Sequence, residues 1–133
     1  MGNDTLYLEL FDTLLGEFDE EPLCVIKNKY VSIPDNDHGN HWYDHLILPA
    51  SVYKRAKKQT TALNRLAEEF VTAFFSIEAP AVSDPAAKRT KASEYVEGLI
   101  SNGGPSTDVF KKKFGEETTG RLFRTVLFGT QCR

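Results

Sequence analysis

The clearest hydrophobic pattern in the chain runs from Ser51 to Ile77, where apolar residues recur at helical spacing. At about 100° per residue, one side of such a helix carries most of the apolar residues of the run: Val52, Ala56, Leu63, Ala67, Phe70 and Phe74. No glycine or proline interrupts the run. The pattern predicts one long central amphipathic helix with other elements packed along it, and places in the core Leu63, Phe70 and Phe74.

The N-terminal stretch carries two competing hydrophobic repeats. Residues 4–15 fit a helix, because apolar residues recur every four positions, Asp4 can cap the start and Gly16 the end. A strand is the alternative, since Leu6, Leu8 and Leu10 also alternate with other residues. The four-residue repeat extends further, so we expect a helix.

Two segments in the first fifty residues favour β structure. Residues 23–33 and 42–48 are rich in β-branched and aromatic side chains, and Asn28-Lys29 lies where a tight turn could join two strands. Residues 34–40 form a polar loop between them. These segments predict a small antiparallel sheet in the N-terminal third, laid against the long helix.

The C-terminal part predicts further helices. Ser83-Asp84-Pro85 suits a helix start, the helix continues over residues 88–101, and Asn102-Gly103-Gly104-Pro105 ends it. Ser106 or Thr107 can cap a following helix, which Gly115 and Gly120 punctuate, and the tail 121–128 fits a helix and a strand equally well. The predicted fold is α+β, a helix-dominated single domain over residues 1–133.

Charge divides the chain near residue 50. Residues 1–50 carry ten acidic and two basic residues, a net charge of −8, whereas residues 51–133 carry fourteen basic and nine acidic residues, a net charge of +5. The acidic and the basic part can neutralise each other within one fold, between two copies, or against other partners.

The basic start of the long predicted helix is the first candidate binding site. Basic, hydroxyl and amide side chains suit contacts with phosphate groups, so a nucleic acid or another partner could bind these residues: Tyr53, Lys54, Arg55, Lys57, Lys58 and Arg65. The simpler interpretation is a solvated helix face that balances the acidic first fifty residues.

The second candidate site is a cluster that contains all three histidines of the chain. Imidazole and carboxylate groups are ligands of zinc and other transition metals, and the candidate ligands are His38, His41, His45, Asp37 and Asp44. The spacing matches no known metal motif and offers no ligand from elsewhere in the chain. We therefore expect a polar loop and no cofactor, with zinc or another divalent metal as the alternative.

The absence of other motifs leaves three functional hypotheses. The chain has no catalytic motif, no apolar run of the roughly 20 residues that span a bilayer, and two cysteines, Cys24 and Cys132, without disulfide spacing. The leading hypothesis is a non-enzymatic, cytoplasmic interaction protein that binds another protein, or a second copy, through a charged surface, as inhibitors, adaptors and assembly subunits do. The alternative is a nucleic-acid-binding protein that uses the basic helix face, and the third is a metal-dependent hydrolase or nuclease at the histidines.

Overall fold

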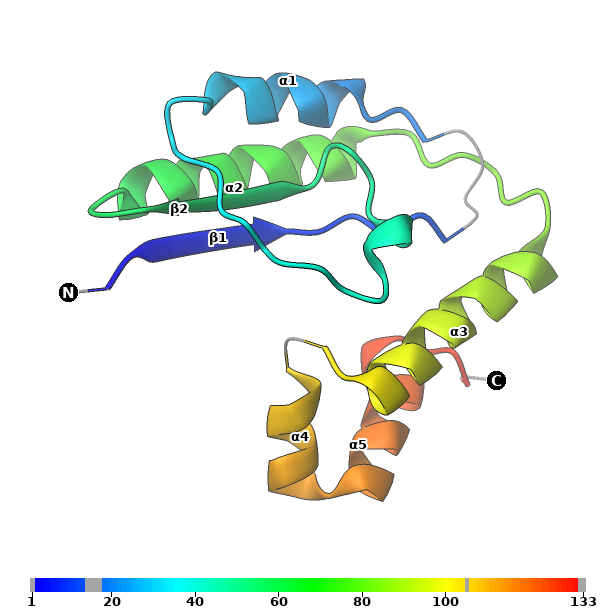
Figure 1. Cartoon of the computed structure of the whole chain (residues 1–133). Helices are drawn as coiled ribbons and strands as arrows, with labels where there is room; N and C mark the ends of the chain where they lie inside the picture. The colour runs from blue at the N-terminus through cyan, green and yellow to red at the C-terminus, as the bar shows by residue number, and fades with distance from the viewer. Residues whose placement is uncertain (1, 14–17, 105, 132–133) are drawn as a thin grey trace. The chain divides into compact units, whose positions relative to one another are not determined.

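The computed structural model describes residues 2–13, 18–104 and 106–131. Over these residues the fold is α+β and dominated by helices, with a two-stranded antiparallel sheet near the N-terminus (Figure 1), which confirms the predicted fold class. The elements follow in the order β1 (Asp4–Leu8), α1 (Glu21–Lys29), the 3₁₀ turn η1 (Asp44–Leu46), β2 (Val52–Ala56), α2 (Thr60–Ser76), α3 (Pro85–Asn102), α4 (Thr107–Phe114), α5 (Glu116–Leu122) and the π-helical turn η2 (Phe123–Leu127).

The chain divides into two compact units, residues 1–81 and residues 82–133, called here the N-terminal and the C-terminal unit. The expectation that residues 1–133 act as a single domain stays a prediction. None of the helices in the described part of the chain combines the length and the apolar character needed to cross a bilayer.

In the N-terminal unit, strand β2 is hydrogen-bonded along both of its edges. It pairs antiparallel with β1, with Leu8 opposite Val52 and Asp4 opposite Ala56. Its other edge takes residues 34–36 through two backbone bonds, from Asn36 N to Tyr53 O at 3.0 Å and from Arg55 N to Pro34 O at 3.1 Å. A strand held on both edges stays extended, because its backbone donors and acceptors already have partners.

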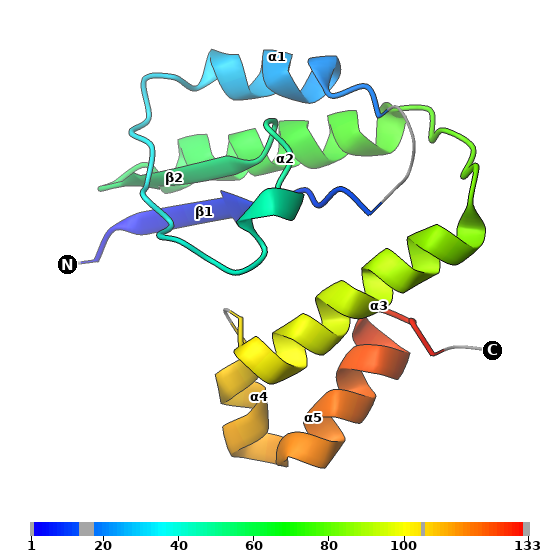
Figure 2. The same ribbon diagram turned by 45° about the vertical axis from the view of Figure 1, so that its right-hand side comes forward.

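Helices α1 and α2 run side by side, and together with the inner face of the sheet they enclose the core (Figures 1 and 2). Residue alternation along each strand sends one set of side chains inward, so Leu6 and Leu8 pack against a buried cluster drawn from all these elements: Leu23, Ala50, Val52, Leu66 and Phe70. The opposite face of the sheet carries Tyr7 and its cross-strand partner Tyr53.

The helix predicted over residues 4–15 and the β structure predicted over residues 23–33 are both wrong. For residues 4–8 the alternative, a strand, is the one that forms. Residues 4–8 form strand β1, because the alternation of Leu6 and Leu8 buries one side of the segment against the core. Residues 21–29 form helix α1 instead of a strand, because a helix places Leu23, Ile26 and Tyr30 along one stripe against the core. The turn expected at Asn28-Lys29 is the end of that helix.

Two smaller predictions in the same unit are also wrong, and a third cannot be compared with the structure. Asp4 caps no helix of its own; its Oδ2 instead accepts hydrogen bonds from Gln59 N at 3.1 Å and Thr60 Oγ1 at 2.8 Å, where α2 begins. The end cap predicted at Gly16 lies outside the described residues. The strand predicted over residues 42–48 is a 3₁₀ turn at Asp44–Leu46 followed by an isolated bridge between Phe11 and Ile47.

The long helix predicted over residues 51–77 is wrong in its first part. Residues 52–56 are strand β2, Lys58 has a φ of 54°, and α2 begins only at Thr60. Leu63 and Phe70 are buried as predicted, but Phe74 is 39% exposed, so its place in the core is a further correction. Beyond Phe70 the contact of α2 with the core continues only through partly buried side chains such as Ala73.

The C-terminal unit follows the predicted pattern more closely. Asp84 Oδ1 accepts a hydrogen bond from Ala87 N at 2.9 Å and so caps α3, which ends before Gly103 with its φ of 82°. Ser106 occupies the N-cap position of α4, and Gly115, also at φ 82°, separates α4 from α5. The ambiguous tail is helical, and Gly120 lies inside α5 instead of ending a helix. Pro105 lies outside the described residues.

Candidate functional site

Lys54 is a buried residue of strand β2 and takes no part in a surface patch. It lies opposite Leu6 on the inner face of the sheet, where its Nζ donates to Ile33 O at 2.9 Å and pairs with Asp35 Oδ1 at 2.7 Å. Its side chain is only 4% exposed. The ammonium group therefore links strand β2 to residues 33–35 through one hydrogen bond and one ion pair.

The remaining residues of the predicted basic face do not share one surface of a helix. Tyr53 and Arg55 point to the outer face of the sheet, because they alternate with Lys54 along β2. Lys57 and Lys58 lie exposed in the turn before α2. The helical face predicted over this stretch is thus replaced by a strand and a turn, and only Arg65 lies on a helix.

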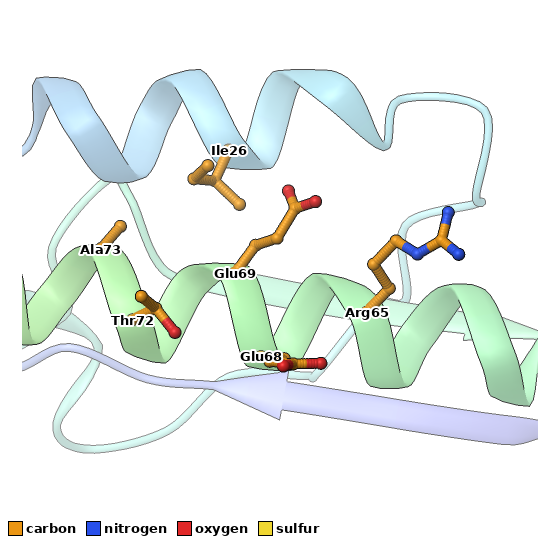
Figure 3. Close-up of a pocket in the computed structure, with 6 residues that line it drawn as sticks. All are labelled: Ile26, Arg65, Glu68, Glu69, Thr72 and Ala73. Carbon is orange, nitrogen blue, oxygen red and sulfur yellow. The ribbon is translucent and has the colours of Figure 1, made fainter.

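Arg65 lines an open depression between α1 and α2 (Figure 3). The lining residues are Ile26, Arg65, Glu68, Glu69, Thr72 and Ala73. Glu69 points across toward α1, where Lys29 Nζ lies 3.4 Å from its Oε2. Two carboxylates beside one guanidinium leave no excess positive charge among the lining residues to attract a phosphate group.

The histidine segment is folded by its two neighbouring aspartates. Asp37 Oδ1 accepts a hydrogen bond from Gly39 N at 2.8 Å, and Gly39 has a φ of 78°, which turns the chain between the first two histidines. Asp44 Oδ2 accepts from His41 N at 2.9 Å, and Asp44 N donates to His41 O at 3.2 Å. This pair of bonds closes the loop and brings three side chains together: His38, His41 and Asp44.

The rings of two histidines and two tyrosines form a stack that starts at Tyr53, on the outer face of the sheet. His38 lies 3.9 Å from Tyr53 between ring centroids, at an interplanar angle of 15°, and His41 lies 4.9 Å from Tyr43 at 14°. The two imidazoles are themselves nearly parallel, with centroids 5.5 Å apart. We call these four residues the imidazole–tyrosine stack, and its packing fixes where each imidazole lies.

The tyrosines of the stack stay neutral at physiological pH. Burial raises the pKa of Tyr43 and of Tyr53, and the negative charge of Glu9 raises both further. The Tyr53 hydroxyl donates a hydrogen bond to Glu9 Oε1 at 3.1 Å. A phenol held in this way supports the stack as a hydrogen-bond donor and is not poised as a base.

Three of the five ligands considered from the sequence converge. One ligand atom from each of His38, His41 and Asp44 lies within 4.8 Å of the other two, and His41 Nδ1 lies 3.4 Å from Asp44 Oδ1. The hydrogen bond from His41 N lowers the pKa of the Asp44 carboxyl group, so this carboxylate is ionised. His45 and Asp37 are exposed and lie outside this group.

A set of exposed large apolar side chains in the C-terminal unit, called here its apolar surface, is the feature that the sequence did not predict. Among the described residues of this unit, only Val96, Leu99 and Phe123 are buried apolar side chains. Five large apolar side chains are exposed instead: Val109, Phe114, Val126, Leu127 and Phe128. The run Val126-Leu127-Phe128 at the end of the tail was the available signal, because a helix cannot bury three consecutive side chains on one stripe.

A row of aromatic rings connects two of these exposed side chains, Phe114 and Phe128. Successive ring centroids are 5.8 Å apart for Phe114 and Phe110, 5.6 Å for Phe110 and Phe123, and 6.0 Å for Phe123 and Phe128. The two end rings of the row, Phe114 and Phe128, are each nearly half exposed. The aromatic packing of the unit thus continues from its interior to its surface.

No protein-family model matches the sequence, and no curated protein matches it either. A function must therefore follow from the two surfaces described above, the imidazole–tyrosine stack and the apolar surface of the C-terminal unit.

Proposed function

We propose that this is a non-enzymatic interaction protein that binds a partner protein through the apolar surface of its C-terminal unit. The proposal rests on how many large apolar side chains of that unit are exposed. Among its described residues, more of them are exposed than are fully buried. In the N-terminal unit the buried ones outnumber the exposed ones. Scattered exposed apolar residues are normal, but a concentration of them is typical of a binding surface.

The net positive charge of the C-terminal unit indicates which charge the partner should carry. Residues 82–133 contain nine basic and six acidic residues, and Lys111, Lys112 and Lys113 lie on α4 between Val109 and Phe114. Protein interfaces combine an apolar centre with a polar rim, and rim charges steer association. We infer a partner that offers apolar side chains surrounded by acidic ones. We place the interaction in the cytoplasm, where the free thiol of Cys24 stays reduced.

Two observations favour a protein partner over a nucleic acid. Lys54, which lay at the centre of the predicted basic patch, is buried and neutralised by Asp35. Arg65 shares its depression with Glu68 and Glu69. The exposed bases that remain near β2 are Arg55, Lys57 and Lys58, in a unit whose sequence carries thirteen acidic and seven basic residues.

The test is affinity capture from cells of the native host, with and without nuclease, followed by affinity measurement with the purified partner. The variant Val126→Ser/Leu127→Ser removes exposed apolar area from the C-terminal unit. The matched control, Val25→Ser/Val31→Ser, removes exposed apolar area from the N-terminal unit. We expect the first variant to bind the partner at least about tenfold more weakly, because apolar residues at an interface centre carry much of the affinity, and the control to bind as the wild type does.

Two results would contradict the proposal. Capture that disappears after nuclease treatment would replace the protein partner by a nucleic acid. Equal affinities of the wild type and the Val126→Ser/Leu127→Ser variant, both measured on folded protein, would move the binding surface away from the C-terminal unit.

A further inference from the structure

The histidine segment contains buried polar atoms that the fold leaves without hydrogen-bond partners. His38 Nδ1, His41 Nδ1 and Asp44 Oδ1 are shielded from solvent and have no regular hydrogen bond among the residues that the structure describes, although His41 Nδ1 and Asp44 Oδ1 face each other at 3.4 Å, an ion pair when the imidazole is protonated. A buried polar atom without a partner costs free energy. A cation between these side chains would satisfy His38 Nδ1 and also bridge the long His41–Asp44 contact.

The distances between these side chains suit a small transition-metal ion. Zinc bonds to nitrogen and oxygen at about 2.0–2.2 Å in tetrahedral sites, which places neighbouring ligand atoms about 3.3–3.5 Å apart. His41 Nδ1 and Asp44 Oδ1 already lie 3.4 Å apart. One ligand atom from each of the three side chains lies within 4.8 Å of the other two, so the His38 ring must turn and approach by up to about 1.5 Å to complete the set.

The donor set distinguishes between classes of ion. Two imidazoles and one carboxylate suit zinc and similar divalent transition metals, whereas calcium and magnesium take oxygen ligands almost exclusively. Three protein ligands leave a fourth position that water or a partner side chain can fill.

The surrounding residues determine how the three side chains lie before an ion binds. Asp44 uses one carboxylate oxygen, Oδ2, for the backbone of His41 and so directs the other, Oδ1, toward the His41 ring. Tyr53 and Tyr43 stack against the two imidazoles. Hydrogen bonds such as the one from His41 N to Asp44 orient metal ligands, whereas the nearly parallel imidazoles, with centroids 5.5 Å apart, must turn relative to each other before both lone pairs point at one ion.

We propose that His38, His41 and Asp44 form a three-ligand site for a divalent ion of the zinc class. The ion binds the loop over residues 38–44, ties its two ends together and stabilises the N-terminal unit, because a ligand that binds only the folded state stabilises it. This site is independent of the apolar surface of the C-terminal unit, so each proposal can fail without the other.

The test is isothermal titration of the chelator-treated full chain with zinc chloride, with thermal unfolding as the second measurement. Three variants remove one ligand each and keep its structural contacts. His38→Phe and His41→Phe keep a flat ring in the stack, and Asp44→Asn keeps an acceptor for His41 N. The matched control is His45→Phe, which makes the same chemical change at the exposed histidine outside the group.

We expect one zinc ion per chain, bound more tightly than about 10 μM, with a rise in the unfolding temperature. Each ligand variant should bind zinc at least about tenfold more weakly, while His45→Phe binds it as the wild type does. Far-UV circular dichroism and urea unfolding confirm that every variant is folded before it is titrated.

Four results would overturn the proposal. They are the absence of zinc binding, equal losses in His45→Phe and in the ligand variants, one ion shared by two chains, and calcium binding as tight as zinc binding.

Discussion

Lys54 Nζ lies 2.7 Å from Asp35 Oδ1, although the lysine side chain is 4% exposed and the aspartate side chain 81% exposed. The ammonium therefore reaches its counter-ion at the edge of the core, while its remaining contact is the Ile33 carbonyl oxygen. This ion pair attaches residues 33–35 to strand β2. His38 follows three positions after Asp35, so the same pair anchors the chain that leads into the imidazole–tyrosine stack.

Removal of the exposed partner of this pair should cost more stability than removal of the buried one. Asp35→Ala leaves a buried ammonium without its counter-ion, and we expect a loss of about 1–3 kcal/mol in the free energy of unfolding. Lys54→Met removes the charge together with the need for a partner, so its loss should be smaller. Urea unfolding measures both, with Glu78→Ala as the control for loss of an exposed acid. A loss for Asp35→Ala no larger than that of the control would mean that water replaces the carboxylate.

The prediction that Phe70 belongs to the core can be tested against a second phenylalanine, Phe75, on the same helix α2. Phe70 is 3% exposed and belongs to the core cluster, whereas Phe75 is 80% exposed. Phe70→Ala should lower the free energy of unfolding by about 3–5 kcal/mol, and Phe75→Ala by less than about 0.5 kcal/mol. Denaturant melts of the two variants give the comparison. Similar losses for both would mean that Phe75 packs against something in solution.

The fold class and the C-terminal helices could be predicted because their signals are local. Asp84, Gly103 and Gly115 act on their own backbone through capping and positive φ, and the structure places each where the sequence did. The errors lie where long-range contacts decide. Residues 52–56 have helical periodicity, but pairing with β1 on one edge and with residues 34–36 on the other holds them extended.

The candidate site was predictable in its residue types but not in its geometry. The spacing of the histidines marked the segment, and three of the five candidate ligands converge. The stack with Tyr53 depends on a contact between residues fifteen positions apart, which no periodicity reveals. His45 lies four positions after His41, a spacing that would share one side of a regular helix, but in the 3₁₀ turn at Asp44–Leu46 it is exposed and outside the group.

The ion pair between Glu97 and Arg124 predicts a specific dependence of stability on pH. Arg124 Nε lies 2.6 Å from Glu97 Oε1 and Nη2 lies 2.8 Å from Oε2, and these bonds lower the pKa of Glu97 below its ordinary value of 4.5. A carboxyl group with a lowered folded-state pKa stabilises the fold above its unfolded pKa, and this contribution is lost as the pH falls through the folded pKa.

We therefore expect Glu97→Gln to lower the free energy of unfolding by about 0.5 kcal/mol near pH 7, a small value because half of the Glu97 side chain is exposed. The difference from the wild type should shrink as the pH falls below about 4.5 and through the lowered folded-state pKa of Glu97. Urea unfolding at several pH values measures it, with Glu94→Gln on the same helix as the control. A difference that stays constant over this range would remove the ion pair as its cause.

The last prediction separates a protein partner from a nucleic acid. If Arg55, Lys57 and Lys58 contacted phosphates, log affinity for duplex DNA would fall with log salt by about 0.9 per neutralised phosphate, a slope of roughly −3 for three contacts. We expect instead that duplex and single-stranded probes bind more weakly than about 1 μM at physiological salt, because the thirteen acidic residues of this unit repel a polyanion. Fluorescence anisotropy at several salt concentrations measures this. Tighter binding that is lost in Lys57→Glu/Lys58→Glu, but kept in the matched Lys111→Glu/Lys112→Glu variant, would establish the basic turn before α2 as a nucleic-acid site and replace the protein-partner proposal.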